Sequence, residues 1–345
     1  MNRRSFLRLG LAGAFVAARP PGLEDAAGRT PVKTLFVTHP AFLEHKPGVG
    51  HPERPERVSC VEAALAAPAF DGLCRAEAPL RDDVEAAILR AHGPEHLLRV
   101  KAVAGAGEFP YAFDGDTSVS TGSFEAAYRA VGAGLLAVDR LFDPARETVN
   151  AFLAVRPPGH HAERGRVMGF CLFNNVACAA LYARKRHGVG RVAIVDFDVH
   201  HGNGTQQIFW EDRDVFFGST HQMPLFPYTG EVSETGVGNI VNAPLRAGDG
   251  GDRFREAMAA RILPALDVFR PDLILISAGF DGHFADPLGD LRLREEDFAW
   301  ITMKLLDAAD RLCHGRIVSF LEGGYSLDAL ERASAAHVGA LMQAG

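Results

Sequence analysis

Four segments of the sequence carry acidic, imidazole or phenol side chains directly after a short apolar run. The side chains are those of Asp196, Asp198 and His200 after residues 192–195, Asp281 after residues 273–277, His160 and His161 after residues 149–155, and Tyr325 after residues 317–321. If the runs are parallel strands, their carboxyl ends meet at one edge of a sheet, where ligands bind in open α/β folds. Clustered carboxylates and imidazoles are costly to bury unless they hold a cation or take part in catalysis. The pattern therefore predicts a metal-dependent active site.

The Asp-x-His pair of Asp198 and His200 provides two candidate metal ligands. If the apolar run continues as a strand to residue 200, residues two apart point to the same face, with Asp196 one step deeper. Asp281 supplies a third ligand from another strand end. Two carboxylates and one imidazole leave room for water, as in catalytic zinc sites. Such ligation also suits Fe(II), Co(II) or Mn(II), so the residue types alone leave the metal open.

Two adjacent histidines, His160 and His161, follow a turn formed by Pro-Pro-Gly at residues 157–159. A rigid turn can present both imidazoles to one water molecule, which favours proton transfer as their role. Tyr325 follows the glycines at 323–324, which let the backbone approach a site closely. Its phenol can donate a hydrogen bond to an oxyanion that develops during a reaction. Taken alone, Tyr325 is as readily a core residue with a satisfied hydroxyl.

The composition is that of a globular protein. Of the 345 residues, 47% are hydrophobic and 23% are charged, which excludes a disordered, collagen-like or coiled-coil chain. The formal net charge of −7 argues against a nucleic-acid binder, which usually carries a basic face. No apolar stretch reaches about 18 residues, so no membrane span is predicted. Five scattered cysteines without a CxxC pair argue against a disulfide scaffold and a thiolate zinc site. The sequence does not indicate an oligomeric state.

Strand-length apolar runs alternate with helical patterns along most of the chain. The predicted strands are Thr34–His39, Val149–Arg156, Arg191–His200, Val215–His221, Asp272–Asp281 and Arg316–Glu322. The predicted helices are Ser123–Phe142, Val176–His187, Phe254–Phe269 and Glu295–Cys313. Because most runs lack strict alternation of polar and apolar residues, the strands are expected to be buried on both faces. This order predicts an α/β fold, a single three-layer domain over residues 34–345 with a mainly parallel central sheet.

The first 18 residues differ in character from the rest of the chain. A basic head with Arg3 and Arg4 precedes a short apolar run and small residues, which is the layout of an export signal. The arginine pair resembles the bacterial twin-arginine signal. Cleavage near Ala18 would remove three arginines and change the net charge from −7 to −10. We predict a signal at residues 1–18, a linker at 19–33 and a periplasmic or secreted protein, or a cytoplasmic one if the signal is not functional.

Several longer motifs occur in the order of a known superfamily. They are HPERPERV (51–58), RPPGHHA (156–162), GFCLFNN (169–175), VDFDVHHGNGTQ (195–206), SAGFDGH (277–283) and LEGGY (321–325). Together they resemble the arginase/histone-deacetylase superfamily, and more closely its class II histone deacetylases and the bacterial acetylpolyamine amidohydrolases. The resemblance covers about residues 34–340 and implies a zinc hydrolase that removes an acetyl group from an amine.

The resemblance also implies bound metal ions. Asp198, His200 and Asp281 match the ligands of one zinc ion per chain. The family binds monovalent cations as well, usually potassium. The nearer potassium site would use Asp196, Asp198, His200 and Ser219, largely through backbone oxygens. Parts of a second monovalent-cation site are matched by Phe209, Asp212 and Val215.

The catalytic groups of the family have counterparts in this sequence. His160 and His161 match the tandem catalytic histidines, and Asp196 matches the acid that pairs with the first of them. Tyr325 matches the tyrosine that polarises the acetyl carbonyl. Asn203 stands where class I enzymes have Asp and class II members commonly have Asn. The resemblance thus implies a complete catalytic set.

The substrate site implied by the resemblance is a tunnel with two aromatic walls, Phe170 and Phe226, with Gly169 directly before the first. Leu288 falls where a polyamine-selective relative carries a gatekeeping glutamate. A leucine at this position favours acyl-lysine-like or broader substrates. Asp116, in a stretch that resembles the rim of the tunnel, can hold a substrate backbone or ammonium group, or simply belong to a turn. A periplasmic location favours a small acetylated amine or an acetylated peptide over a histone.

Two alternatives stay open at this point. An arginase-like hydrolase with two manganese ions needs an Asp-x-Asp cluster, whereas Asp281 is followed by Gly282 and His283. A non-catalytic module that binds acyl groups or amines needs no proton-transfer residues. Counting metal ions per chain distinguishes the two-manganese enzyme from a deacetylase with one zinc ion. An acetyl-lysine assay with and without a chelator distinguishes the non-catalytic module from a metal-dependent deacetylase.

Overall fold

The computed structural model describes residues 33–145 and 147–344 of the chain, and these belong to one compact unit. The predicted export signal at residues 1–18 lies outside the described residues, as does the predicted linker at 19–33 apart from Lys33. Lys33 is the first residue of strand β1. The signal and the linker therefore stay predictions.

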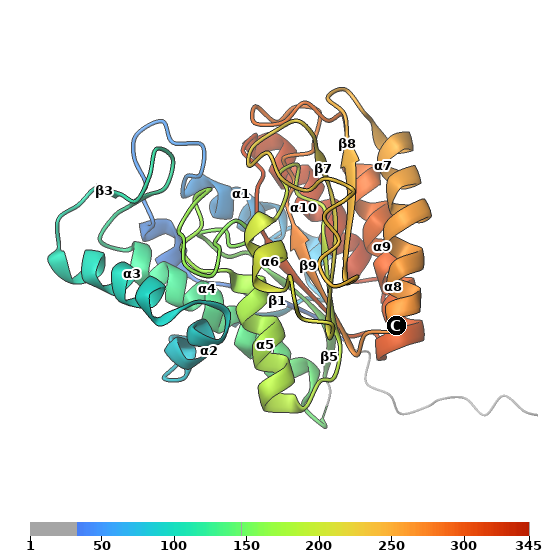
Figure 1. The fold of residues 1–345 in the computed structure, drawn as a ribbon, viewed down its shortest axis with the longest axis horizontal. Coiled ribbons are helices and arrows are strands. Elements are labelled where there is room, and N and C mark those ends of the chain that lie inside the picture. Colours follow the sequence, from blue (N-terminus) through green and yellow to red (C-terminus); the bar gives the residue numbers. More distant parts are fainter. Residues whose placement is uncertain (1–32, 146, 345) are drawn as a thin grey trace, which may run out of the picture. The chain divides into compact units, whose positions relative to one another are not determined.

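A sheet of eight parallel strands lies at the centre of the described residues (Figure 1). The strands are β1 (Lys33–Thr38), β2 (Cys74–Glu77), β5 (Thr148–Leu153), β6 (Val192–Asp196), β7 (Val215–Gln222), β8 (Ile240–Leu245), β9 (Leu273–Ala278) and β10 (Ile317–Leu321). Their order is β2-β1-β5-β10-β9-β6-β7-β8, and each neighbouring pair is parallel. A small antiparallel ribbon pairs β3 (Tyr111–Ala112) with β4 (Ser118–Val119). The predicted α/β class with a mainly parallel sheet is confirmed.

Helices cover both faces of this sheet. They are α1 (Glu56–Ala64), α2 (Val84–Ala91), α3 (Pro94–Ala106), α4 (Ser123–Leu141), α5 (Asn175–His187), α6 (Asn203–Ile208), α7 (Gly251–Ala257), α8 (Leu263–Phe269), α9 (Glu295–Cys313) and α10 (Leu327–Leu341). Figure 1 shows α5 on one side of the sheet and α8 and α9 on the other. Helix α4 packs on α5, and α9 packs on α10, which completes the three layers. In the described part of the chain, every helix is too short or too polar to cross a membrane.

The sequence explains why the central strands lie inside. Every residue of β6, β7, β9 and β10 is buried, which matches runs such as Leu273–Ala278 that are apolar on both faces. Helix α5 begins where the side chain of Asn174 accepts a hydrogen bond from the backbone N–H of Ala177 at 3.0 Å. It ends at Gly188, which adopts a left-handed conformation with φ 65°. Local signals thus set the length of α5.

The strand order places four chemically important loops side by side. Strands β5, β10, β9 and β6 are consecutive neighbours at the middle of the sheet. The segments that follow them carry His160 and His161, Tyr325, Asp281, and Asp198 with His200, respectively. Because all four strands run parallel, their carboxyl ends share one edge of the sheet.

Three predicted strands end at least three residues earlier than expected, and the first of them, predicted for Val149–Arg156, stops at Leu153. The strand predicted for Arg191–His200 stops at Asp196, and the one predicted for Asp272–Asp281 stops at Ala278. Asp198 and His200 therefore do not share a face through strand alternation. A turn brings them together instead, because Oδ1 of Asp198 accepts the backbone N–H of His200 at 2.8 Å. The carboxylate competes with the sheet for backbone donors and ends the strand.

The helix predicted for Phe254–Phe269 is continuous in space but not regular. Helix α7 is followed by a π-helical turn at Met258–Ile262 and then by α8. Pro264 near the start of α8 has no N–H to donate, which explains the irregular turn before it. Strands β2 and β8, both at an edge of the sheet, were not predicted; β2 is only four residues long, and β8 contains Pro244. The helices α1, α2, α3, α6 and α10 were not predicted either.

Candidate active site

The three predicted metal ligands lie together beyond the carboxyl ends of β6 and β9. One potential ligand atom from each of Asp198, His200 and Asp281 lies within 4.8 Å of the others. Nδ1 of His200 is 3.2 Å from Oδ1 of Asp198 and 3.1 Å from Oδ2 of Asp281. Two carboxylates and one imidazole at this spacing fit a divalent cation with an open coordination position.

Electrostatics support this fit. Burial, together with the nearby carboxylate of Asp198, raises the pKa of Asp281 to about 7. Burial would lower the pKa of His200, but hydrogen bonds with Asp198 and Asp281 raise it to about 10. The two carboxylates therefore lie close together in a place that water hardly reaches, where their negative charge is costly unless a positive charge lies beside it. A divalent cation would neutralise that charge, so the donor set suits a bound metal ion.

Backbone groups orient the two carboxylates. Oδ2 of Asp198 accepts the N–H of Gly323 at 2.8 Å, and Oδ1 of Asp281 accepts the N–H of Val199 at 2.9 Å. A Cβ atom at position 323 would lie 2.1 Å from Oδ2 of Asp281, so only glycine allows this close approach. The ligands are thus held in place by the loops that follow β6 and β10.

His160 forms a pair with a buried carboxylate. Its Nδ1 lies 3.0 Å from Oδ2 of Asp196, and its Nε2 lies 3.9 Å from Oδ2 of Asp198. Burial would lower the pKa of His160, but the charges of Asp198 and Asp196 outweigh it and raise the pKa to about 10. The structure therefore places His160 between the metal cluster and the acid predicted to pair with it.

His161 is connected to an amide instead. Its Nδ1 lies 2.8 Å from Oδ1 of Asn203, and Nδ2 of Asn203 donates to Oε1 of Glu163 at 2.8 Å. Because the Asn203 oxygen can only accept, the hydrogen-bond network assigns the His161 proton to Nδ1 and leaves Nε2 as an acceptor. Burial lowers the pKa of His161 well below its ordinary value, and the charge of His160 adds to this effect. His161 is thus suited to accept a proton.

Tyr325 is 8% exposed and is held on three sides. Its backbone N–H donates to Oδ2 of Asp286 at 2.6 Å. The guanidinium of Arg57 lies 4.8 Å from the centre of the Tyr325 ring, and the ring of Phe170 lies 5.8 Å away, edge to face. Burial raises the pKa of the phenol well above its ordinary value, although Arg57 opposes the shift. The phenol therefore stays protonated and can act as a donor.

A buried ionic network behind Tyr325 was not predicted. Glu53 accepts hydrogen bonds from Arg57 at 3.0 Å and from Arg156 at 2.5 and 2.8 Å, and Nε2 of His45 lies 3.1 Å from it. Nε of Arg57 also donates to the carbonyl of Gly324 at 2.6 Å, next to Tyr325. Burial opposes ionisation of Glu53, but the charge of Arg156 keeps its pKa well below the ordinary value. The motifs at 51–58 and 156–162 contain Glu53, Arg57 and Arg156 but give no sign that they pair.

Glu322, in the LEGGY motif, is a second residue that the sequence analysis left without a role. Its Oε2 accepts the N–H groups of Gly159 at 2.6 Å and His160 at 3.2 Å, and its Oε1 accepts the hydroxyl of Ser277 at 3.1 Å. Burial raises the pKa of Glu322 to about 7. Glu322 therefore ties the turn that carries the histidine pair to the ends of β9 and β10.

The two predicted aromatic walls contact the catalytic candidates. The ring of Phe226 lies 5.2 Å from that of His161, and Phe170 faces Tyr325. Gly169 has a φ of 55°, and a Cβ there would lie 2.4 Å from the His161 ring. Phe170 itself has a φ of 67°, an uncommon conformation for a bulky residue, and its N–H donates to Oγ1 of Thr117 at 3.1 Å. The strained turn thus presents Phe170 beside the site.

The predicted rim residues connect to the same site. Leu288, half-buried, donates its N–H to Oδ1 of Asp286 at 3.0 Å, the carboxylate that also holds Tyr325. Asp116 is exposed, and its carbonyl lies 3.1 Å from Nε2 of His51. The ring of His51 lies 4.8 Å from Phe170. Leu288 is therefore linked to Tyr325 through Asp286, and Asp116 is linked to Phe170 through His51.

The residues of the first predicted potassium site are also neighbours. Asp196 pairs with Ser219 in the register of β6 and β7, and Asp198 and His200 follow directly in the chain. The hydroxyl of Ser219 lies 3.0 Å from Nδ1 of His221. A potassium ion at this place stays a prediction. At the second predicted potassium site, the side chain of Asn239 contacts the backbone carbonyls of Phe209, Asp212 and Val215.

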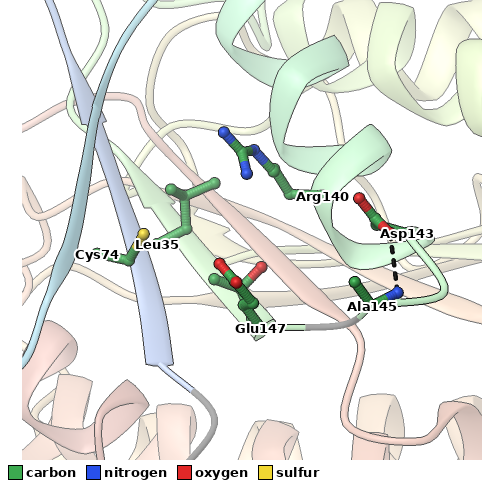
Figure 2. A pocket seen from close by; sticks show the side chains of 7 residues that line it. Leu35, Cys74, Arg140, Asp143, Ala145 and Glu147 are labelled. Atoms are coloured by element: carbon green, nitrogen blue, oxygen red, sulfur yellow. Dashed lines mark hydrogen bonds between the residues drawn. The ribbon is translucent and has the colours of Figure 1, made fainter.

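A separate pocket lies at the opposite end of the sheet (Figure 2). It is lined by Leu35, Cys74, Arg140, Asp143, Ala145, Glu147 and Thr148. Figure 2 shows Ala145 donating its N–H to Asp143, a hydrogen bond of 2.9 Å that shapes the loop after α4. Since Thr148 begins β5, this pocket lies at the amino ends of the strands and shares no residue with the candidate site.

Comparison with known proteins places the chain in a family. Residues 51–341 match the family model described as "Histone deacetylase domain". The chain is 40% identical over 291 residues to the histone deacetylase-like amidohydrolase of Pseudomonas aeruginosa, covering 83% of this chain and 75% of that protein. It is 38% identical over 312 residues to the chloroplastic histone deacetylase 10 of Oryza sativa subsp. japonica, covering 86% and 70%. The crystal structure of the HDA15 HD domain superposes with a TM-score of 0.82 at 34% identity, covering 90% and 88%.

These matches agree with the residues at the site. The family model and relatives with deacetylase names favour a deacetylase over an arginase-like enzyme or a non-catalytic module. The predicted superfamily is confirmed. The chain belongs to the histone deacetylase family and is a deacetylase-type hydrolase that acts on amides.

Proposed function

We propose that the chain is a zinc-dependent amidohydrolase that removes an acetyl group from an amine, such as N6-acetyl-lysine or an acetylpolyamine. The observation that carries the proposal is the placement of Asp198, His200 and Asp281 beside a tandem histidine pair. Tyr325 lies two positions after Gly323, whose N–H donates to Oδ2 of Asp198 at 2.8 Å. The family match supports an acetylated substrate.

Asp198, His200 and Asp281 would hold the zinc ion. When bound, zinc polarises an acyl carbonyl and makes water more acidic at neutral pH. The buried carboxylates supply the negative charge that a divalent cation requires, and backbone donors from Gly323 and Val199 fix their orientation. The same donors suit iron, cobalt or manganese, so zinc is proposed from the family rather than from the donor types.

His161 would act as the general base and then as the general acid. Its Nδ1–H donates to Asn203, which leaves Nε2 free to take a proton from water and return it to the leaving amine. His160, hydrogen-bonded to Asp196, would orient the reacting groups and contribute charge beside the metal cluster. The two imidazole centres lie 4.0 Å apart, so both face the same small volume.

Tyr325 would donate a hydrogen bond to the oxyanion that develops on the acyl carbonyl. Its high pKa keeps the phenol protonated over the pH range in which the histidines titrate. Asp286 and Arg57 hold the Tyr325 backbone and ring in place, so the donor is preorganised before substrate binds. A preorganised donor stabilises the transition state without a reorganisation cost.

Phe170 and Phe226 would enclose the methylene chain that carries the acetylated nitrogen. Their rings pack next to Tyr325 and His161, respectively, so a chain between them ends at the catalytic groups. Leu288 stands in place of an acidic gate residue, so the rim has no negative charge at this position that would select a polyamine. We therefore favour acetyl-lysine-like or broader substrates over strict polyamine selectivity.

A metal-defined activity screen tests the proposal. The purified chain is stripped with a chelator, reloaded with Zn(II), Fe(II), Co(II) or Mn(II), and assayed on an acetyl-lysine peptide, an acetylpolyamine and a simple acetamide. We expect activity to be lost on chelation and restored by metal, with Tyr325→Phe as a control that binds metal but turns over poorly. Full activity in the chelated protein, or no hydrolysis of any of the three substrates, would contradict the proposal.

A further inference from the structure

A buried side-chain amide lies at the centre of three backbone carbonyl groups in the loop between α6 and β7. Nδ2 of Asn239 is 2.9 Å from the carbonyl oxygen of Phe209, 3.1 Å from that of Asp212 and 2.8 Å from that of Val215. Asn239 is 5% exposed. Phe209, Asp212 and Val215 are the residues that the family resemblance associates with parts of a second monovalent-cation site.

The orientation of the amide follows from its other atom. Oδ1 of Asn239 accepts the backbone N–H of Val237 at 3.2 Å. If the amide were turned over, its oxygen would face three carbonyl oxygens and its nitrogen would face an N–H group. Both changes replace attraction by repulsion, so the nitrogen must point toward the carbonyl groups.

The amide and a cation would compete for the same volume. Converging carbonyl oxygens are the groups that replace the hydration shell of a potassium ion in proteins. An ion in contact with all three oxygens, on the side of the loop from which Asn239 approaches, would occupy the place that Nδ2 of Asn239 fills. The amide has two N–H donors for three carbonyl acceptors. The carbonyl of Phe209 also accepts the backbone N–H of Asp212 at 3.1 Å, and the carbonyl of Asp212 accepts that of Val215 at 3.1 Å.

The surrounding backbone holds Asn239 in this position. Its carbonyl accepts the N–H of Phe217 in β7 at 3.0 Å. Gly236, with a φ of 54°, lets the chain turn just before it, and a Cβ at position 236 would lie 2.7 Å from Oδ1 of Asn239. Asn239 is the residue directly before β8, and its side chain reaches from there into the loop of residues 209–215.

We propose that Asn239 replaces the second monovalent cation in this chain: its side-chain amide, rather than a potassium ion, ties the loop of residues 209–215 to the edge of the sheet. The loop leads from α6 into β7, the neighbour of β6, and two of the metal ligands follow directly after β6. Stability at this place is then independent of the potassium concentration. The proposal concerns only this position and does not depend on the proposed zinc chemistry.

Asn239→Ala tests the proposal, because it removes the donor and leaves the three carbonyl groups converging on a small void. Thermal unfolding is followed in choline chloride and in KCl at equal ionic strength. We expect the variant to melt below the wild type in choline and to gain several degrees more than the wild type on transfer to KCl, because an ion that binds only the folded state stabilises it. An equal gain for both proteins contradicts the proposal, and this comparison cancels any potassium effect at the site near Ser219.

Asn242→Ala is the matched control. Asn242 is a buried asparagine three positions further along, and its Nδ2 donates to Oε1 of Gln206 at 2.7 Å and to the carbonyl of Glu234 at 3.1 Å. Its removal should lower stability without adding a response to potassium. If Asn242→Ala gains as much from KCl as Asn239→Ala, the effect is not specific and the proposal fails.

A measurement on the wild type keeps the proposal testable even if Asn239→Ala does not fold. Crystals of the wild-type protein are soaked in a thallium(I) salt, and the anomalous signal locates the bound ions. We expect no peak among the carbonyl oxygens of Phe209, Asp212 and Val215. A thallium peak there, with the Asn239 side chain displaced, would overturn the proposal.

Discussion

The side-chain oxygen of Asn203 lies 2.8 Å from Nδ1 of His161, and this contact determines which nitrogen of the imidazole faces the site. Glu163 accepts the Asn203 amide from behind at 2.8 Å, so the asparagine cannot turn over without losing both hydrogen bonds. If the amide turned over, Nδ2 of Asn203 would face the N–H donor at Nδ1 of His161. The arrangement keeps Nε2 of His161 as a proton acceptor.

Removal of this contact should weaken catalysis without removing metal. For Asn203→Ala we expect kcat to fall by about 10–100-fold, the usual effect of losing a group that orients an active-site ligand or base. Metal content, measured by atomic emission, should match that of the wild type. A variant with wild-type kcat would show that the Asn203 contact does not orient the base.

Tyr325→Phe should lower kcat by about 10²–10³-fold, because it removes a donor aimed at the developing oxyanion. The ring remains, so its contacts with Arg57 and Phe170 and the metal content should be retained. Steady-state kinetics on an acetyl-lysine peptide, together with metal analysis, measure both. A kcat equal to that of the wild type would remove Tyr325 from the mechanism.

Asp198→Ala and Asp281→Ala should each lose metal and activity together, because two ligands cannot hold the ion as three do. Asp267→Ala serves as the control, since Asp267 is 45% exposed and pairs with Arg311 at the surface. Metal content per chain and activity are measured on the same samples. Full metal occupancy in both ligand variants would mean that the ion binds elsewhere.

Arg156→Met should lower the free energy of unfolding by about 3–5 kcal/mol, because it leaves the buried Glu53 carboxylate without its two-pronged partner. Arg156→Lys keeps the charge but not the planar fork, so we expect it to recover only part of the loss. Urea unfolding of the three proteins measures the differences. A Met variant within about 1 kcal/mol of the wild type would show that Glu53 finds other partners.

His337 should make stability depend on pH. Its ring is fully buried between Thr302 and Ser319, at 2.6 and 2.8 Å, and burial lowers its pKa to about 3. The unfolded chain, with a pKa of about 6.5, takes up a proton first as the pH falls, so the stabilisation is complete above pH ~6.5 and is lost toward pH ~3.

His337→Gln removes this titration. The difference in unfolding free energy between wild type and variant should shrink by about 2 kcal/mol between about pH 7 and pH 5. Other buried histidines titrate in both proteins, so the difference isolates His337. Denaturant unfolding at each pH gives the values, and a difference that does not change with pH would mean that the ring is already charged or already accessible.

Much of the site could be predicted because its residues stand directly after apolar runs. Asp198, His200, Asp281 and Tyr325 all follow strands that the structure contains, and burial on both faces of those strands was visible in their composition. The exact ends of the strands could not be read in this way. Carboxylates such as Asp198 accept backbone N–H groups of the following turn, and this competition depends on the neighbouring loops.

The supporting contacts depend on the tertiary structure. Arg156 and Glu53 are 103 positions apart, and their pairing requires the loop before α1 to fold over the end of β5. The sequence by itself determined which strand ends carry metal ligands, histidines and a phenol. Only the tertiary structure decided that β5, β10, β9 and β6 are neighbours and that Asn239 reaches the carbonyl groups of a distant loop. Such contacts form between surfaces brought together by packing of the sheet and its helices, and no local pattern specifies which surfaces those are.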